Sequence, residues 1–127
     1  MKEIILYSYS KCSTCRKAAK WLDQNNITYE LIDLVTNPPS KQLLSHIIKD
    51  FQLDKKKLFN TRGKNFKDLD LKDINNFPDE KVINLLRNDG KLIKRPLLVS
   101  PQKILFGFNE NEYKSILCNE NNKDINK

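Results

Sequence analysis

The sequence has few side chains that can bind a transition metal: three cysteines and a single histidine among 127 residues. A structural zinc site needs four ligands, so Cys12, Cys15, Cys118 and His46 would all have to meet at one ion. Only the two N-terminal cysteines have the CxxC spacing that is typical of ligands, whereas Cys118 and His46 have no such pairing. We therefore expect no metal site. Cys118, which ends an apolar helical pattern, is expected to be a small buried side chain.

Long apolar runs are also missing. No stretch approaches the ~20 apolar residues that span a bilayer, and the N-terminal MKEIILYSYS lacks a full signal-peptide core and a small-residue cleavage site. We therefore expect no membrane association and a cytoplasmic protein, in a compartment that keeps thiols reduced. The length and the clustered hydrophobic residues, 39% of the chain, predict a single, monomeric domain with a real core.

Arginine is scarce although the chain is basic. Of the 23 basic residues, 19 are lysine and four are arginine, and the formal net charge is +7. The lysines are scattered, apart from the run at 55–57, and the sequence is also rich in asparagine and isoleucine. This bias is typical of AT-rich codons, so the charge gives no strong signal for direct nucleic-acid binding.

The first third of the chain has the pattern of a strand–helix–strand unit. Residues 3–8 are short and apolar, residues 13–25 have apolar positions at helical spacing, and residues 28–34 alternate as in a strand. This order predicts two parallel strands joined by a right-handed crossover.

The segment from 37 to 90 is polar and helical. Prolines in TNPPS break the chain, Ser40 can cap a helix, and Gly90 fits a helix stop. The expected helical elements are 41–50, 54–59, 65–74 and 79–88. The pattern then changes to two strands.

Residues 96–100 and 103–108 predict an antiparallel hairpin that turns at Pro101-Gln102, followed by a helix over 109–118 with Asn109 as its cap. The tail 119–127 is expected to be disordered.

The predicted fold class is therefore α/β. A β-α-β unit followed by a β-β-α unit is the order of the thioredoxin-like fold with a mixed sheet. In this prediction residues 1–118 form one domain, with 1–36 and 91–118 as the core. Residues 37–90 are a helical insert, expected as a lid or subdomain over one edge.

Two cysteines, in YSYSKCSTCRKAA, follow the first strand and open the first helix. Free N–H groups and the dipole at a helix N-terminus favour the thiolate of Cys12, and Cys15 lies one turn further on. Lys11 and Arg16 add positive charge. The pattern predicts a thiol–disulfide exchange site with Cys12 and Cys15 as catalytic residues. A pair of merely structural core cysteines is the alternative.

Two other motifs add candidate residues. In KRPLLV, Pro96 opens a strand at the place where a thioredoxin-like fold has a cis-proline beside the CxxC, and Arg95 would point towards Cys12. A trans proline that merely starts a strand is the alternative. In FNTRG, Arg62 precedes a turn glycine and could hold an anion with its planar guanidinium group.

The motifs CSTCRKA, NPPS, FNTRG, KRPLLV and FGFNENEY, in this order, make residues 3–118 resemble the ArsC/Spx family. That family contains glutaredoxin-coupled arsenate reductases, the redox-sensing regulators Spx and MgsR, and YffB-like proteins. The resemblance implies a thioredoxin-like fold with a helical insert. It matches Cys12 to the family's nucleophile, and Arg62 and Arg95 to two arginines around the oxyanion.

The chain departs from the arsenate reductases at three places. Gly107 and Phe108 stand where those enzymes have a third arginine, Cys15 stands where they often have serine, and their histidine near position 8 is absent. One fewer guanidinium group should weaken oxyanion binding, because a charge-assisted hydrogen bond contributes about 1.5–3 kcal/mol. The CxxC and the GFNE segment are more similar to Spx and MgsR.

The resemblance implies two functions. One is a redox switch in which the Cys12–Cys15 pair controls binding to the C-terminal domain of the RNA polymerase α subunit. The other is an arsenate reductase-like thiol oxidoreductase with Cys12 as nucleophile. Neither needs a bound cofactor; glutathione, glutaredoxin or thioredoxin would supply electrons. An interaction domain with incidental cysteines is the third hypothesis.

Overall fold

The computed structural model describes residues 3–51, 55–69, 74–101 and 103–118. The N-terminal unit consists of strand β1 (Ile5–Ser8), helix α1 (Ser13–Gln24) and strand β2 (Glu30–Asp33). β1 and β2 pair in parallel, with Leu6 opposite Leu31. The predicted β-α-β unit is therefore confirmed, with strands shorter than expected.

The sheet has four strands in the order β2-β1-β3-β4. Strands β3 (Leu97–Val99) and β4 (Ile104–Phe106) form the predicted antiparallel hairpin, and β3 also pairs antiparallel with β1. Because β1–β2 is parallel and the other two pairs are antiparallel, the sheet is mixed. The predicted α/β fold class is confirmed. Gln102 of the expected turn lies outside the described residues.

The segment between β2 and β3 contains three α-helices and three short 3₁₀ helices in its described part. The α-helices are α2 (Lys41–Phe51), α3 (Lys64–Leu69) and α4 (Asp79–Asn88). The 3₁₀ helices are η1 (Lys55–Leu58), η2 (Ile74–Asn76) and η3 (Gly90–Leu92). The hydroxyl of Ser40 accepts a hydrogen bond from the Leu43 amide (3.1 Å), as expected of a cap. Of the expected element 65–74, the described part contains α3 and the first residue of η2, and 70–73 lie outside the described residues.

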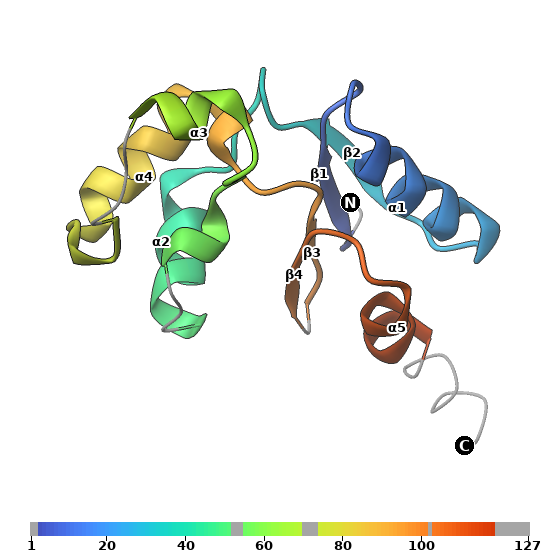
Figure 1. Cartoon of the computed structure of the whole chain (residues 1–127). Helices are drawn as coiled ribbons and strands as arrows, with labels where there is room; N and C mark the ends of the chain where they lie inside the picture. Colours follow the sequence, from blue (N-terminus) through green and yellow to red (C-terminus); the bar gives the residue numbers. More distant parts are fainter. Residues whose placement is uncertain (1–2, 52–54, 70–73, 102, 119–127) are drawn as a thin grey trace.

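The sheet separates two helical layers (Figure 1): α1 and α5 (Glu110–Tyr113) lie on one face, and α2, α3 and α4 on the other. The sheet residues that pack towards α1 and α5 include Leu6, Leu98 and Leu105. Those that pack towards the insert include Tyr7, Leu97 and Ile104. The insert thus covers a whole face, which corrects the expected lid over one edge. The central strands are apolar on both sides, so both faces must be buried. That residues 1–118 are one domain stays a prediction.

Gly90 does not stop α4 in the expected way. α4 ends at Asn88, Asp89 follows in an extended conformation, and Gly90 is the first residue of η3. A Cβ atom on Gly90 would lie 2.2 Å from the carbonyl oxygen of Leu34. Glycine is therefore required by the close approach to the chain that follows β2, rather than by a left-handed helix end.

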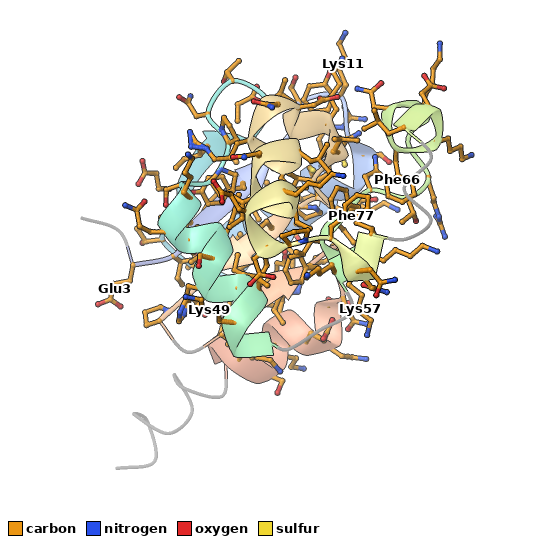
Figure 2. The ribbon with its side chains drawn as sticks, turned by 90° about the vertical axis from the view of Figure 1, so that its left-hand side faces the viewer. Glu3, Lys11, Lys49, Lys57, Phe66 and Phe77 are labelled. Atoms are coloured by element: carbon orange, nitrogen blue, oxygen red, sulfur yellow. The ribbon has the colours of Figure 1, made fainter. Side chains whose placement is uncertain are left out.

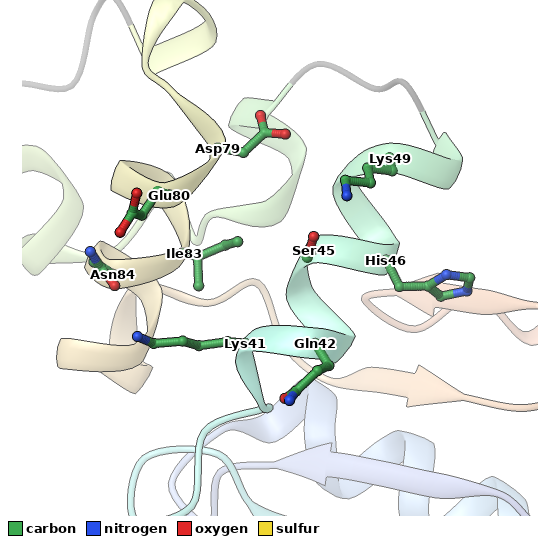
Figure 3. Close-up of a pocket in the computed structure, with 9 residues that line it drawn as sticks. All are labelled: Lys41, Gln42, Ser45, His46, Lys49, Asp79, Glu80, Ile83 and Asn84. Carbon is green, nitrogen blue, oxygen red and sulfur yellow. The ribbon is translucent and has the colours of Figure 1, made fainter.

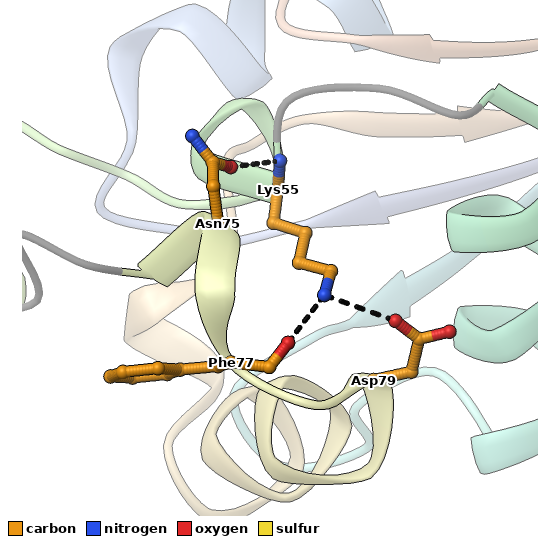
Figure 4. Close-up of polar contacts among 4 residues, drawn as sticks. All are labelled: Lys55, Asn75, Phe77 and Asp79. Carbon is orange, nitrogen blue, oxygen red and sulfur yellow. Dashed lines mark hydrogen bonds and ion pairs between the residues drawn. The ribbon is translucent and has the colours of Figure 1, made fainter.

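Lys55 fastens η1 to the start of α4 (Figure 4). Its backbone N–H donates to the side chain of Asn75 (2.8 Å), and its ammonium group donates to the Phe77 carbonyl and pairs with Asp79 (3.1 Å). This lysine therefore has a structural partner. Other lysines, such as Lys49 and Lys57, lie at separate places on the surface (Figure 2), in agreement with a scattered charge.

The chain after β4 begins with the predicted helix. Asn109 caps α5 through its side-chain oxygen, which accepts from the Glu112 amide (3.0 Å). The last described turn, Lys114–Cys118, is a wider π-helix, which the pattern did not predict. The tail 119–127 lies outside the described residues. In the part of the chain that is described, no helix is long and apolar enough to cross a bilayer.

Candidate redox site

Cys12 stands at the N-terminus of α1, directly after the turn that follows β1. It is the N-cap residue, with φ −95° and ψ 116°, and its sulfur accepts a hydrogen bond from the Cys15 amide at 3.3 Å. The side chain is half-buried. Cys12 thus stands at the free N–H groups of the first helical turn, the position typical of a nucleophilic cysteine.

Cys15 lies one turn further along α1 and is completely buried. Burial, and to a smaller extent its hydrogen bond with Cys12, raise the pKa of its thiol to about 12. Cys15 is therefore a neutral thiol at physiological pH. Both cysteines are free. The pair is asymmetric: the Cys12 sulfur is accessible at the end of the helix, and the Cys15 sulfur is buried and protonated.

Tyr113 of α5 closes the buried side of this pair. Burial raises the pKa of its phenol, and a negative charge on Cys15 would raise it further. Its hydroxyl donates to the Gly107 carbonyl (3.3 Å), and its ring meets Trp21 and Phe108 edge-on, at centroid distances of 5.7 and 4.9 Å. The apolar pattern placed Tyr113 in the core, but nothing in the sequence indicated that it approaches Cys15.

A cleft of about 540 Å³ opens beside Cys12. It is lined by four segments of the chain: Cys12 with Thr14, residues 59–62, residues 94–95 and residues 106–109. The structure thus brings Cys12, Arg62 and Arg95 to one cavity, although they are far apart in the sequence. Gly107 and Phe108 also line it, so they contribute no charge at the place that the resemblance matches to the third arginine of the arsenate reductases. The roles of these residues stay predictions.

Arg95 is held at the edge of the cleft by neighbours on two sides. Its Nη1 donates to the carbonyl oxygen of Lys91 (3.1 Å), and its guanidinium group lies 5.0 Å from the centre of the Tyr9 ring. The Arg95–Pro96 peptide bond is cis, the geometry expected from the sequence. The carbonyl of Pro96 accepts from the Gly107 amide (2.8 Å), which joins the two loops of the cleft wall.

A larger cavity, of about 760 Å³, lies between α2 and α4 (Figure 3). Lys41 and Lys49 line it together with Asp79 and Glu80, so its charges are mixed, and no cysteine reaches it. His46 is on its rim. The chemistry that the sequence predicts therefore belongs to the smaller cleft.

The structure keeps the other metal-binding residue types away from the CxxC cleft. Neither Cys118 nor His46 lines it, and Cys118 is half-buried against the cluster around α1 and α5. Among the described residues, no three His, Cys, Asp or Glu side chains are grouped so that they could hold a metal ion.

Comparison with known proteins gives relatives along most of the chain. A model of the ArsC family matches residues 7–116. An uncharacterized protein, YusI of Bacillus subtilis strain 168, is 39% identical over 111 residues, which are 87% of this chain and 94% of YusI. The global transcriptional regulator Spx of Lactiplantibacillus plantarum is 29% identical over 114 residues, 90% of this chain and 86% of that regulator.

Solved structures indicate the same family. A Streptococcus mutans UA159 protein described as a possible arsenate reductase is 40% identical, with a TM-score of 0.80 over 86% of this chain and 93% of that one. An ArsC family related protein from Bacteroides fragilis is 38% identical, with a TM-score of 0.81 over 89% and 96% of the two chains. By its sequence and its fold, the chain belongs to the ArsC family.

Proposed function

We propose that the protein is a thiol–disulfide redox switch that regulates transcription through RNA polymerase. The observation that carries this proposal is the asymmetric pair: Cys12, half-buried at the start of α1, and Cys15, fully buried one turn beneath it. Such a pair separates the sulfur that meets the oxidant from the sulfur that completes the reaction.

The switch reaction is an ordinary exchange. The Cys12 thiolate attacks a disulfide RS–SR, forms a mixed disulfide with one half and releases the other half as a thiolate, which takes up a proton. Cys15 then loses its proton, attacks the Cys12 sulfur and releases the second thiol. The protein dithiol is oxidised, and the external disulfide is reduced to two thiols. A glutaredoxin or thioredoxin can reverse the reaction.

Disulfide formation has a structural consequence at the first turn of α1. In the reduced protein the Cys12 sulfur accepts the Cys15 N–H at 3.3 Å. A bond between the two sulfurs needs a Cβ···Cβ distance of about 3.5–4.5 Å, so the two thiol side chains must approach each other when it forms. The cleft wall beside Cys12 changes with it. This change is the signal that a partner would read.

The partner that we propose is the C-terminal domain of the RNA polymerase α subunit. Support comes from the relatives named as global transcriptional regulators, which match 90% of this chain, and from the likeness of the CxxC and GFNE segments to Spx and MgsR. The scattered lysines are compatible with a protein partner, since this function needs no continuous basic surface.

A pull-down with the purified α C-terminal domain tests the proposal. Capture should differ between the reduced protein and the protein oxidised by a disulfide, and the Cys12→Ser and Cys15→Ser variants should give equal capture in both states. Cys118→Ser is the matched control and should behave as the unchanged protein. Equal capture of both oxidation states by the unchanged protein would refute the regulatory role.

The cleft favours a second candidate, an arsenate reductase-like oxidoreductase. Arg62 and Arg95 line the cavity beside Cys12 and could hold an oxyanion against its sulfur. An arsenate reduction assay with glutathione and glutaredoxin distinguishes the candidates. A reductase shows turnover that Cys12→Ser abolishes, whereas a regulator shows none and keeps its redox-dependent capture.

A further inference from the structure

The charge of the CxxC cleft is of one sign. Arg62, Lys94 and Arg95 line it, and none of the other described residues in its wall is acidic. The larger cavity between α2 and α4 differs in this respect, because two lysines and the carboxylates of Asp79 and Glu80 all line it (Figure 3). A uniform positive charge in a concave site raises the local concentration of anions.

Lys94 gives the cleft a third cation, which lies beside the uncharged residue Gly107. A Cβ atom built on Gly107 would lie 3.5 Å from Cε of Lys94, so the lysine side chain passes beside the bare backbone of Gly107. Gly107 has a φ of 74°, which favours glycine, and its lack of a side chain leaves this space to the lysine. Two residues from different loops therefore place an ammonium group in the same cavity as Cys12.

Among the residues that the structure describes, no carboxylate neutralises this charge. Within the described part of the chain, Arg62, Lys94 and Arg95 form no ion pair, and the hydrogen bond of Arg95 goes to a neutral carbonyl. Lys55 shows the contrast, since Asp79 pairs with it at 3.1 Å. The three cleft cations are thus available to a ligand.

We propose that the cleft selects anionic disulfides, whose carboxylates reach its cations while Cys12 meets a sulfur atom, and that Lys94 is a specificity-determining residue. The inference rests on the proposed redox function of Cys12. In the reaction, Cys12 attacks one sulfur of the anionic disulfide, whose carboxylates lie against the cations, and the other half leaves as a thiol. Cys15 then displaces the bound half, and the protein ends as the Cys12–Cys15 disulfide.

Three small disulfides of different charge test this selection. Glutathione disulfide is anionic, 2-hydroxyethyl disulfide is neutral and cystamine is cationic. The reduced full-length protein is mixed with each, quenched with acid, and its remaining thiols are counted by mass spectrometry. For each disulfide the rate of Lys94→Gln is divided by that of the unchanged protein, so the intrinsic reactivity of the disulfide cancels.

Lys94→Gln should react about three- to fivefold more slowly with glutathione disulfide, as expected for one exposed charge pair. It should react equally with the neutral disulfide and faster with cystamine. Lys57→Gln is the matched control, because Lys57 is also exposed but lies outside the cleft wall, and its ratios should stay near one. About 1 M salt, which shortens the screening length to about 3 Å, should abolish the effect of Lys94→Gln.

The outcomes separate the two proposals. If the neutral disulfide fails to link Cys12 to Cys15 in the unchanged protein, the redox function itself is wrong. If it does link them, but Lys94→Gln alters the three rates equally or resembles Lys57→Gln, the redox function stands and the charge selection is overturned.

Discussion

Cys15 should resist alkylation in the folded protein, while Cys12 reacts. The perturbation is a pulse of iodoacetamide at pH 7 on the reduced chain. The reagent attacks thiolates, and burial holds the pKa of Cys15 at about 12, against 9.0 for an ordinary cysteine in the same scale. Cys12 is half-buried and borders the cleft, so the reagent can reach it.

The expected difference is large. With a pKa of about 12, Cys15 is ionised to about one part in 10⁵ at pH 7, about a thousandfold less than an unperturbed thiol. Its full burial slows the reaction further, because the reagent must wait for an opening of the structure. The dominant modified species should therefore carry one group on Cys12.

Peptide mass spectrometry over a time course measures the rate at each cysteine. The same protein unfolded in guanidinium gives the unprotected rates, and the half-buried Cys118 serves as an internal comparison. A Cys15 rate within tenfold of its unfolded value, in protein whose circular dichroism remains native, would show that Cys15 is not the protected partner, and the asymmetry argument would fail.

Two further predictions concern stability. Gly90→Ala should destabilise the fold by about 1–3 kcal/mol or more, because the new Cβ would meet the fixed backbone of Leu34. Gly63→Ala is the control and should cost less, because its new Cβ would mainly meet the rotatable side chain of Asn60. Urea unfolding of both variants measures the two losses of stability, and equal losses would contradict the prediction. The raised pKa of Cys15 predicts weaker stability in alkali, because the unfolded chain loses this proton above pH 9 while the folded chain keeps it. Between pH 8 and pH 10 the free energy of unfolding of the unchanged protein should fall by about 1.4 kcal/mol more than that of Cys15→Ala. Urea unfolding at both pH values measures this difference, and equal decreases in the two proteins would refute the raised pKa of Cys15.

The sequence was most informative where local pattern and chemistry agree. The helix over 13–25 and the two strands around it follow from apolar spacing, and the CxxC at their junction marks the start of α1. Asn109 and Ser40 were recognisable as caps because their side chains act within three residues. These features depend on near neighbours, which one sequence contains.

Features that depend on distant neighbours were misread or missed. Gly90 looked like a helix stop, yet its cause is the Leu34 carbonyl, more than fifty positions earlier in the chain. Lys94 seemed one of many scattered lysines, and its place in the cleft depends on Gly107 across the hairpin. The position of the insert on a face of the sheet also depended on how both sides of the central strands are buried.

The four segments that line the CxxC cleft have a consequence for the fate of damaged copies. They extend from Cys12 to Asn109, so the cavity exists only when nearly the whole chain has folded. In an unfolded copy the two cysteines become ordinary, equally exposed thiols, without helix dipole, burial or neighbouring cations. Such a copy would be oxidised by any disulfide and would carry no reliable signal, so the fidelity of the proposed switch would be limited by the fraction of molecules that is folded.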